Sequence, residues 1–417
     1  MNTTHYLIAG ASHAGLEAAH RIRLVDETSP ITMVTRDAHP PYSPTILPYV
    51  VSGQSEPGRV VLRKPDWFEQ HNINLVSDDE LVAIDEAQRQ VTLKSGQQWQ
   101  YEKLLLATGA DPIIPPIPGL EKTPFHVLRT MQHAVALRDH AGKAKRAVVL
   151  GAGLIGMHGA ENLRHAGLEV TIVEMCDQVL PGYFDSRAAS VIEEAFNDNG
   201  IRMLMGSRVV EVEPEGEGCR IQLENGDSLE TELLLVATGV RPQLDFLAGT
   251  SVANDQGILV DDRMRTSADN IWAAGDVTQA TDFYGDKPVM MGILPDAVTQ
   301  GAVAAMDMSE DHALKPYAGG VPINTYTFFG QQAISVGQSM AEDGIEELTR
   351  LDDDNRGYLK ILLRDNQLHG ISSINQEMDA GIMWQLILRR VDLTPVRDAF
   401  IERPLETGRA LMSSTWR

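Results

Sequence analysis

The sequence is poor in cysteine, in basic residues and in long apolar runs. Its two cysteines, Cys176 and Cys219, form neither a metal-ligand spacing nor a disulfide framework. Its 35 Lys and Arg stand against 58 Asp and Glu, and this net charge of −23 excludes a basic nucleic-acid footprint and disfavours an anionic membrane surface. No apolar run reaches the roughly 18 residues of a spanning helix, and no charged segment precedes the first apolar run as in a signal peptide. We therefore expect a cytoplasmic protein without metal, nucleic-acid or membrane partners.

The organisation of the chain indicates several domains. Its 417 residues suit two or three domains, and 43% hydrophobic residues can build sizeable cores. Apolar runs of strand length alternate with helical periodicity through the first three quarters, which favours α/β layers with parallel sheets. Segments 323–338 and 358–374 alternate like antiparallel strands, and 383–391 has a helical pattern. The acidic segment 342–354 is expected to be a solvated hairpin loop or helix face without a function of its own.

A glycine-rich turn lies in the middle of the chain. Residues 148–150 run into Gly151-x-Gly153-x-x-Gly156, and a helical stretch and a second apolar run ending in Glu174 follow. The glycines permit a tight turn, close approach of the backbone to a pyrophosphate and close packing of helix on strand. The helix N-terminus offers free N–H groups to phosphate. Glu174 stands where a carboxylate accepts from an adenine ribose and repels a 2′-phosphate, so this pattern predicts a dinucleotide site that prefers NAD.

A less regular version of the same turn lies near the N-terminus. A short apolar run enters Gly10-x-Ser12-x-x-Gly15, in which serine replaces the middle glycine and still allows a close backbone approach. The ribose-binding acid would fall at Thr35, which is not an acid. The Thr35 hydroxyl or Asp37 could bind a ribose instead. By itself this turn is equally compatible with an ordinary strand–helix connection.

A third element follows at residues 265–277. An apolar strand at 271–274 ends in Gly275-Asp276. Gly275 allows the backbone to approach a ligand closely. We expect Asp276 at the start of the following helix, where its carboxylate can accept a hydroxyl. Taken alone, this is an ordinary strand ending in a Gly-Asp turn.

The ordered set of these elements resembles a known family. GASHAG near the N-terminus, two ATG segments at 107–109 and 237–239, GAGLIG between them and AAGDV afterwards resemble the flavoproteins of the pyridine nucleotide-disulphide oxidoreductase family. The resemblance implies an α/β fold with two Rossmann-like dinucleotide-binding domains, the NAD domain being inserted in a split FAD domain, and a C-terminal α+β interface domain. The implied boundaries place the FAD domain at 1–115 and 244–319, the NAD domain at 116–243 and the interface domain at 320–417.

The resemblance also implies the cofactor contacts. Asp276 would hold the ribityl chain of FAD, and Arg129 would lie near the flavin. His13 could touch an FAD phosphate or face solvent. The full set of predicted FAD contacts is Gly10, Ser12, His13, Ala14, Gly15, Thr35, Arg36, Thr45, Val82, Ala107, Thr108, Gly109, Arg129, Gly275, Asp276 and Pro295. The predicted NAD contacts are Gly151, Gly153, Leu154, Ile155, Gly156, Glu174, Thr238 and Gly239.

The missing cysteines indicate the branch of the family. Members that use a redox-active disulfide or a single reactive cysteine carry it in the first domain, whereas this chain has no cysteine before Cys176. Electrons must therefore leave the flavin directly. Segment 41–49, PYSPTILPY, is similar to the P-Y-x-R-P-x-L-S-K segment of ferredoxin, rubredoxin and nitrite-reductase-like flavoproteins. It matches at the Pro, Tyr and Leu and departs at Pro44, Thr45, Pro48 and Tyr49, which suggests a distinct branch.

One departure affects the predicted contact between nicotinamide and flavin N5. Related reductases pair a Lys of the first domain with a Glu two residues after the third glycine of the central turn. The matching positions here hold Tyr49 and His158, so both charges are replaced together. These two side chains could share one neutral hydrogen bond, or either could simply pack. They are the candidate residues near the reacting atoms.

We therefore expect an FAD-dependent NAD(H) oxidoreductase that exchanges electrons with an iron–sulfur carrier. Segment 40–53 also resembles the NAD-side flavoprotein subunits of multi-subunit 2-oxoacid oxidoreductases, which implies a hetero-oligomeric complex. A free NADH:ferredoxin or rubredoxin reductase is the alternative, and a homodimer is compatible with either. A third hypothesis, a non-catalytic FAD-binding sensor or scaffold, conflicts with the intact NAD motif.

Overall fold

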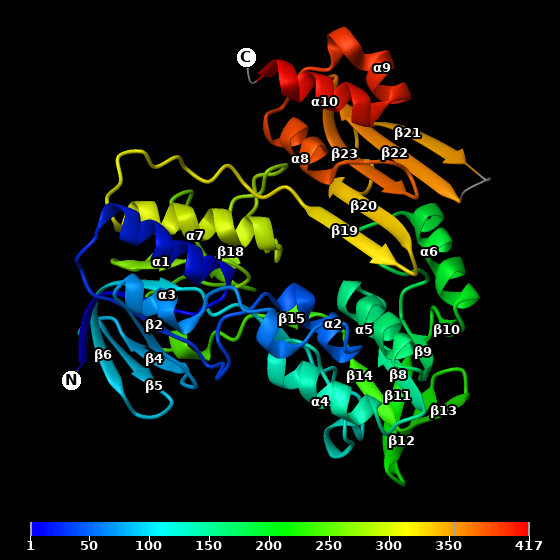
Figure 1. The fold of residues 1–417 in the computed structure, drawn as a ribbon, viewed down its shortest axis with the longest axis horizontal. Helices are drawn as coiled ribbons and strands as arrows, with labels where there is room; N and C mark the ends of the chain where they lie inside the picture. Colours follow the sequence, from blue (N-terminus) through cyan, green and yellow to red (C-terminus); the bar gives the residue numbers. More distant parts are fainter. Residues whose placement is uncertain (1, 353–355, 416–417) are drawn as a thin grey trace.

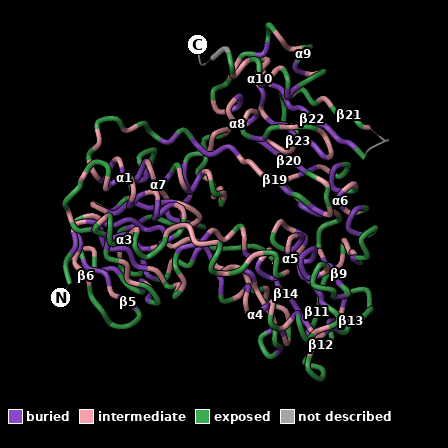
Figure 2. The backbone as a smooth tube through the Cα atoms, in the orientation of Figure 1, coloured by how far each residue is buried: buried purple, intermediate pink, exposed green. Residues whose placement is uncertain are grey.

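The computed structural model describes residues 2–352 and 356–415. It shows three bodies of layered structure (Figure 1): an N-terminal sheet with helices, a central sheet with helices, and a C-terminal sheet. Buried residues concentrate along the strands of each sheet (Figure 2). Within the described ranges we find no helix with the length and apolar character needed to cross a membrane.

The N-terminal sheet takes its strands from two distant regions of the chain. Its order is β3-β2-β1-β6-β5-β4, and β17 pairs with β6 in parallel. β2, β17 and the C-terminal halves of β1 and β6 are apolar and deeply buried, as expected for strands covered on both faces. The parallel members are β1 (Asn2–Ala9), β2 (Ile31–Val34), β3 (Ile73–Val76), β6 (Gln98–Leu106) and β17 (Ile271–Ala273). The antiparallel edge consists of β4 (Leu81–Asp85) and β5 (Gln90–Leu93).

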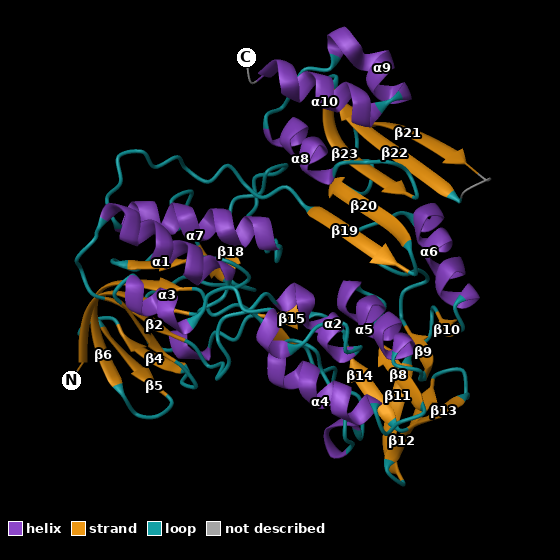
Figure 3. Ribbon diagram, viewed as in Figure 1, coloured by secondary structure: helices purple, strands orange, loops and turns teal. Residues whose placement is uncertain are grey.

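Two helices from opposite ends of this region lie side by side over the sheet (Figures 1 and 3). They are α1 (His13–Val25) and α7 (Leu294–Met308). Gly301 of α7 makes the close approach possible, because a Cβ there would lie 2.3 Å from the backbone oxygen of Ala14. A shorter helix, α3 (Pro65–Gln70), precedes strand β3 of this sheet. The middle of α7 is therefore held against the first turn of α1.

The central body contains a parallel sheet of order β10-β9-β8-β14 and a small antiparallel sheet, β11-β12-β13. Two short strands, β7 (Asp111–Pro112) and β15 (Val240–Arg241), pair where the chain passes between the N-terminal and central bodies. The parallel strands are β8 (Arg146–Leu150), β9 (Glu169–Val173), β10 (Ile201–Leu204) and β14 (Leu233–Val236). The antiparallel strands are β11 (Val209–Glu215), β12 (Gly218–Leu223) and β13 (Ser228–Thr231). The helices are α4 (Met131–Ala141), α5 (Leu154–His165) and α6 (Ser186–Asp198).

The C-terminal body is an antiparallel sheet of order β19-β20-β23-β22-β21 with helices on it, as predicted. The prediction that segment 342–354 is a hairpin loop or helix face is partly wrong, because Glu346–Asp352 forms the edge strand β21. Only the residues before this strand form a turn, and residues 353–354 lie outside the described ranges. Charged side chains are compatible with a solvated edge strand. The other strands are β19 (Ile323–Phe328), β20 (Gln331–Gly337), β22 (Gly357–Arg364) and β23 (Gln367–Ile374). The helices are α8 (Ala380–Leu388), α9 (Arg397–Glu402) and α10 (Pro404–Thr415).

Buried polar contacts join the C-terminal sheet to the central body. The Lys360 ammonium on β22 donates to Asp185, the N-cap of α6, at 2.7 Å. The Tyr358 hydroxyl donates to the same carboxylate. Ser335 of β20 donates to the backbone oxygen of Tyr183 at 2.8 Å. These contacts fix the C-terminal sheet beside the start of α6 (Figure 1).

A second predicted element differs from the structure. Asp276 was expected at the start of a helix, but it lies in a turn that leads into the short strand β18 (Thr278–Gln279). Strand β18 pairs with β16 (Ile258–Leu259), so tertiary pairing continues the chain as a strand here. The short helix α2 (Leu47–Val51) begins within segment 41–49 and packs on α4 and α5.

Candidate flavin and nicotinamide nucleotide sites

The first glycine-rich turn has the geometry that a nucleotide phosphate needs. Gly10 has a φ of +118°, and a Cβ at this position would lie 2.0 Å from the backbone oxygen of Ala107. A Cβ at Gly15 would lie 2.0 Å from the backbone oxygen of Gly10. Ser12 is the N-cap of α1, and its hydroxyl caps no backbone N–H among the described residues. The hydroxyl and the first N–H groups of α1 are therefore available to an anion.

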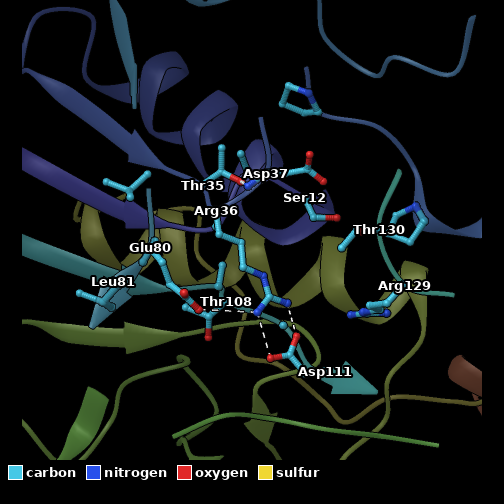
Figure 4. A pocket seen from close by; sticks show the side chains of 18 of the residues that line it. Ser12, Thr35, Arg36, Asp37, Glu80, Leu81, Thr108, Asp111, Arg129 and Thr130 are labelled. Carbon is cyan, nitrogen blue, oxygen red and sulfur yellow. Dashed lines mark hydrogen bonds and ion pairs between the residues drawn. The ribbon is translucent and has the colours of Figure 1, made fainter. Parts of the chain in front are cut away.

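A cavity of about 780 Å³ opens beside this turn (Figure 4). Its walls come from the end of β1, the segment after β2, the ATG segment after β6 and the segment before α4. Half of the predicted FAD contacts line it. These are Gly10, Ser12, Thr35, Arg36, Ala107, Thr108, Gly109 and Arg129.

The other predicted FAD contacts are not among the residues that line this cavity. Ala14 and Gly15 lie in the first turn of α1, and Pro295 lies in the first turn of α7. His13 is half-buried, and its Nε2 lies 3.0 Å from the Ser43 hydroxyl, so a contact of His13 with an FAD phosphate stays a prediction. That hydroxyl also bonds to Thr45 at 2.8 Å.

Val82 is the one predicted FAD contact that lies apart from this group. It is 42% exposed, and its neighbours Glu80 and Leu81 line the cavity in its place. Side chains alternate along a strand, so the Val82 side chain points away from the face that carries Leu81, and the FAD contact at Val82 stays a prediction.

Gly275 and Asp276 reach the cavity through Arg129. Arg129 donates to the Asp276 carboxylate at 2.8 Å and to the backbone oxygen of Ala110 at 2.8 Å. Both members of this ion pair are about one quarter exposed. The pair brings the Gly-Asp turn after β17 to the edge of the cavity, where the resemblance places the flavin end of FAD.

A second ion pair in the cavity was not predicted. Figure 4 shows Arg36 reaching toward Asp111, with one bond of 2.9 Å and a second, parallel bond. Glu80 lies 3.7 Å from the same guanidinium. The Asp111 hydrogen bonds raise the pKa of Arg36 above its usual range. The partners lie 75 residues apart, and no sequence signal joins them.

The structure bears on the missing ribose-binding acid. Asp37 lines the cavity, but its carboxylate accepts from the backbone N–H of His39 at 2.9 Å and from the hydroxyl of Tyr42. Asp37 therefore already satisfies local donors. Thr35 also lines the cavity, and its hydroxyl receives a longer bond of 3.3 Å from the Asp37 backbone N–H.

Unpartnered polar groups in the cavity wall fit an absent polar ligand. The Thr108 hydroxyl and the Nδ1 of His133 are two of the buried atoms in the described chain that lack a hydrogen-bond partner, and both residues line the cavity. A buried polar group without a partner costs about 1–3 kcal/mol. Together with the close backbone at Gly10, these groups fit a bound dinucleotide.

The second glycine-rich turn repeats the geometry in the central body. Gly151 has a φ of +105°, and a Cβ there would lie 2.4 Å from the backbone oxygen of Ala237. A Cβ at Gly156 would lie 2.0 Å from the backbone oxygen of Gly151. Gly153 is the N-cap of α5, and no described atom lies within 4 Å of a Cβ built there. Leu154 and Ile155 begin the helix, so this turn also fits a dinucleotide phosphate.

Glu174 lies beside this turn, as predicted for a ribose-binding acid. Its two carboxylate oxygens accept from the backbone N–H groups of Ala152 at 2.7 Å and Cys176 at 2.8 Å. Each oxygen keeps a further lone pair for a ligand hydroxyl. Thr238 and Gly239 lie where the chain passes between the N-terminal and central bodies. The Thr238 hydroxyl donates to the backbone oxygen of Ile113, and the Ile113 backbone N–H donates to the backbone oxygen of Gly239.

Tyr49 and His158 meet between the two sites. Their ring centroids lie 6.3 Å apart and the rings are tilted, so they pack together. A third ring, Tyr326 of β19, meets His158 edge to face at 4.5 Å. The Nδ1 of His158 and the Tyr326 hydroxyl are buried and unpartnered within the described chain. Burial lowers the pKa of His158 to about 4, so the imidazole is neutral at pH 7.

The comparisons with known proteins agree with this geometry. A model of the pyridine nucleotide-disulphide oxidoreductase family matches residues 4–306. The NADH-dependent phenylglyoxylate dehydrogenase subunit epsilon of Aromatoleum evansii is 54% identical over 415 residues, which cover 99% of this chain and 98% of that protein. The NADH-rubredoxin oxidoreductase of Clostridium acetobutylicum is 26% identical over 374 residues, 90% of this chain and 92% of that protein.

A solved structure shows the same fold. The ferredoxin reductase of Rhodopseudomonas palustris superposes with a TM-score of 0.82 and 27% identity, covering 94% of this chain and 100% of that chain. The two cysteines of this sequence are free, Cys176 being exposed and Cys219 buried, so the active-site disulfide is absent. The chain belongs to the pyridine nucleotide-disulphide oxidoreductase family, which implies FAD and NAD as its cofactors.

Proposed function

We propose that this chain is the NAD-side flavoprotein subunit of a phenylglyoxylate-type 2-oxoacid dehydrogenase, passing electrons between NAD and an iron–sulfur carrier. The observation that carries the proposal is the 54% identity, over nearly the full length of both chains, to the epsilon subunit of that enzyme in Aromatoleum evansii. We also propose the domain division 1–115, 116–243, 244–319 and 320–417. A cytoplasmic location is supported by two free cysteines in the whole sequence.

The first site would hold FAD. The N-terminus of α1 and the Ser12 hydroxyl would bind the pyrophosphate, and the Thr108 hydroxyl would gain a partner in the ligand. Asp276, held at the cavity edge by Arg129, would accept a hydroxyl of the ribityl chain. Arg36, which donates to the Asp111 carboxylate, would contact the adenosine end of FAD.

The second site would hold NAD. The N-terminus of α5 would bind the pyrophosphate, and Glu174 would accept the 2′-hydroxyl of the adenine ribose. The bound cofactors supply hydride transfer between nicotinamide C4 and flavin N5, and the flavin supplies single-electron exchange with the iron–sulfur carrier. Tyr49 and His158 would pack at this contact and exclude water without adding charge.

The partner would be a permanently bound subunit. Ferredoxins met by collision are usually acidic, and a reductase gains association rate from a basic face. This chain carries 58 acidic and 35 basic residues, so its long-range field would repel such a partner. A stable subunit interface does not depend on steering.

The test is purification of the tagged full-length chain from its native host. We expect a stoichiometric complex that contains iron–sulfur subunits and bound FAD and that reduces NAD⁺ with phenylglyoxylate. A free NADH:ferredoxin or rubredoxin reductase is the second candidate, favoured by the likeness to the Rhodopseudomonas palustris and Clostridium acetobutylicum proteins. A chain that purifies alone, and that reduces an added acidic ferredoxin at a rate falling steeply with salt, would support this candidate instead.

A further inference from the structure

We propose that Asp296 is a positioning residue of the flavin site, and that its ionisation couples the reduction potential of the bound FAD to pH. This inference rests on the proposed function, since it assumes that FAD occupies the first site. The sequence pattern predicts an FAD contact at Pro295 and assigns nothing to the residue after it.

Asp296 is a buried carboxyl with two well-formed hydrogen bonds. It lies in the first turn of α7 and is 6% exposed. Its Oδ1 accepts from the Tyr317 hydroxyl at 2.5 Å. Its Oδ2 accepts from the Gln300 side-chain amide at 2.9 Å. Both oxygens are therefore held in one orientation inside the protein.

Gln300 connects this carboxyl to the turn that carries Asp276. The Gln300 side-chain oxygen accepts from the Gly275 backbone N–H at 2.8 Å and from the Thr278 hydroxyl at 2.8 Å. Because the Gln300 amide donates to the Asp296 carboxylate, its oxygen must face Gly275. The orientation of the Gly-Asp turn thus depends on a carboxyl one side chain away.

The charges around Asp296 are mostly negative or neutral. Burial is the largest effect on the pKa of Asp296 and raises it, and the hydrogen bonds from Tyr317 and Gln300 lower it. The charge of Asp276 raises it, and the net result is a pKa of about 6. Arg129 faces Asp276 and not Asp296. The carboxyl therefore titrates close to neutrality.

A second cavity gives this carboxyl access to water. It measures about 340 Å³ and lies between α7, the segment before β19 and helix α8. Asp296 and Tyr317 line it, Lys315 is the basic residue in its wall, and α8 contributes the apolar Trp384 and Leu388. Protons can reach Asp296 from this side without passing the flavin.

The sign of the effect follows from charge. Below the pKa of Asp296 the carboxyl is neutral. Above it, a negative charge lies next to the Gly275–Asp276 turn, which already carries the charge of Asp276. Reduction of a flavin adds negative charge to its ring, so the ionised carboxylate should lower the FAD potential. Protonation should raise it.

The experiment is a redox titration of purified FAD-loaded protein from pH 5 to pH 8.5. We expect Asp296→Asn to have a higher potential than wild type at pH 8, with the gap closing toward pH 5. Tyr317→Phe removes one hydrogen bond that stabilises the carboxylate, so its curve should meet that of Asp296→Asn at a higher pH than wild type does. Asp269→Asn, an exposed carboxylate on the segment before β17, is the matched control and should follow wild type.

The outcomes separate the inference from the proposed function. If wild type binds FAD but the wild-type and Asp296→Asn potentials differ by a constant or not at all across this range, the ionisation of Asp296 does not act on the flavin and the inference is overturned. If Asp296→Asn does not fold, an unshifted Tyr317→Phe curve overturns it equally. Protein without FAD would overturn both the inference and the proposed function.

Discussion

Glu174→Ala is the sharpest test of the nucleotide preference. The carboxylate accepts from the backbone N–H groups of Ala152 and Cys176, and we propose that it also accepts the ribose 2′-hydroxyl of NADH. It therefore has two separable effects: it fixes the glycine-rich turn for either nucleotide, and it discriminates a 2′-hydroxyl from a 2′-phosphate.

The expected magnitudes can be worked out for each nucleotide. Loss of the charge-assisted hydrogen bond to the ribose should cost NADH roughly 1–3 kcal/mol, which corresponds to about 5- to 150-fold in affinity. NADPH has no 2′-hydroxyl to lose. Removing a carboxylate about 4 Å from its 2′-phosphate relieves about 1 kcal/mol of repulsion in a water-like medium. The preference for NADH should therefore fall by about one to three orders of magnitude.

The assay is steady-state kcat/KM with each nucleotide and an artificial electron acceptor. Wild type should strongly prefer NADH, and Glu174→Ala should lose most of this preference. Glu169→Ala is the matched control, because it removes an exposed carboxylate from the opposite end of the same strand, β9. It should leave both values near wild type.

Two results would refute this reasoning. Equal efficiency with NADPH in wild type would show that Glu174 does not select the nucleotide. An equal fold loss for NADH and NADPH in Glu174→Ala would show that the carboxylate only shapes the turn through its bonds to Ala152 and Cys176.

Further variants test the Tyr49–His158 contact between the two sites and the Lys360–Asp185 ion pair that joins the C-terminal sheet to the central body. Tyr49→Lys combined with His158→Glu should raise the two-electron FAD potential, because a cation returns beside flavin N5. Tyr49→Lys alone should fold or bind FAD worse, because a buried charge then lacks its partner. A redox titration that gives an unchanged or lower potential for the double variant contradicts this expectation. Lys360→Met should lower the free energy of unfolding in urea by about 3–5 kcal/mol, because it leaves the Asp185 carboxylate without its cation. Combining it with Asp185→Asn should cost less than the sum of the single changes, and simple additivity would show that the pair is not coupled.

The nucleotide turns could be predicted because their chemistry is local. Each needs glycine at fixed spacings where the chain passes from strand to helix, and the close backbone contacts at Gly10, Gly15, Gly151 and Gly156 show why. The antiparallel pattern of the C-terminal sheet was equally readable, since its strands alternate in sequence. The acidic edge strand β21 was not, because a solvated edge strand has a polar composition like that of a loop.

The remaining site features depend on contacts between distant segments. Arg36 meets Asp111 across 75 residues, and Tyr326 reaches His158 from a sheet formed far along the chain. The turn at Asp276 continues as a strand because β16 pairs with β18, a tertiary constraint that overrides the local pattern. Such contacts follow from the assembled fold and leave no periodic signal in the sequence.

The electrostatics of the two proposed flavin neighbours point in the same direction. At one side, Tyr49 and a neutral His158 occupy the positions at which related reductases carry a Lys–Glu pair. Tyr326, from the C-terminal sheet, packs on the His158 ring. At the other, the buried carboxyl of Asp296 lies one side chain from the turn of Asp276. A missing cation and an added anion both disfavour the negative charge of the reduced flavin. A low FAD potential is what reversible exchange between NAD and low-potential iron–sulfur clusters requires, whereas a reductase that only consumes NADH gains from a higher one. The same residues therefore favour the subunit of a 2-oxoacid dehydrogenase over the free reductase on grounds independent of sequence identity.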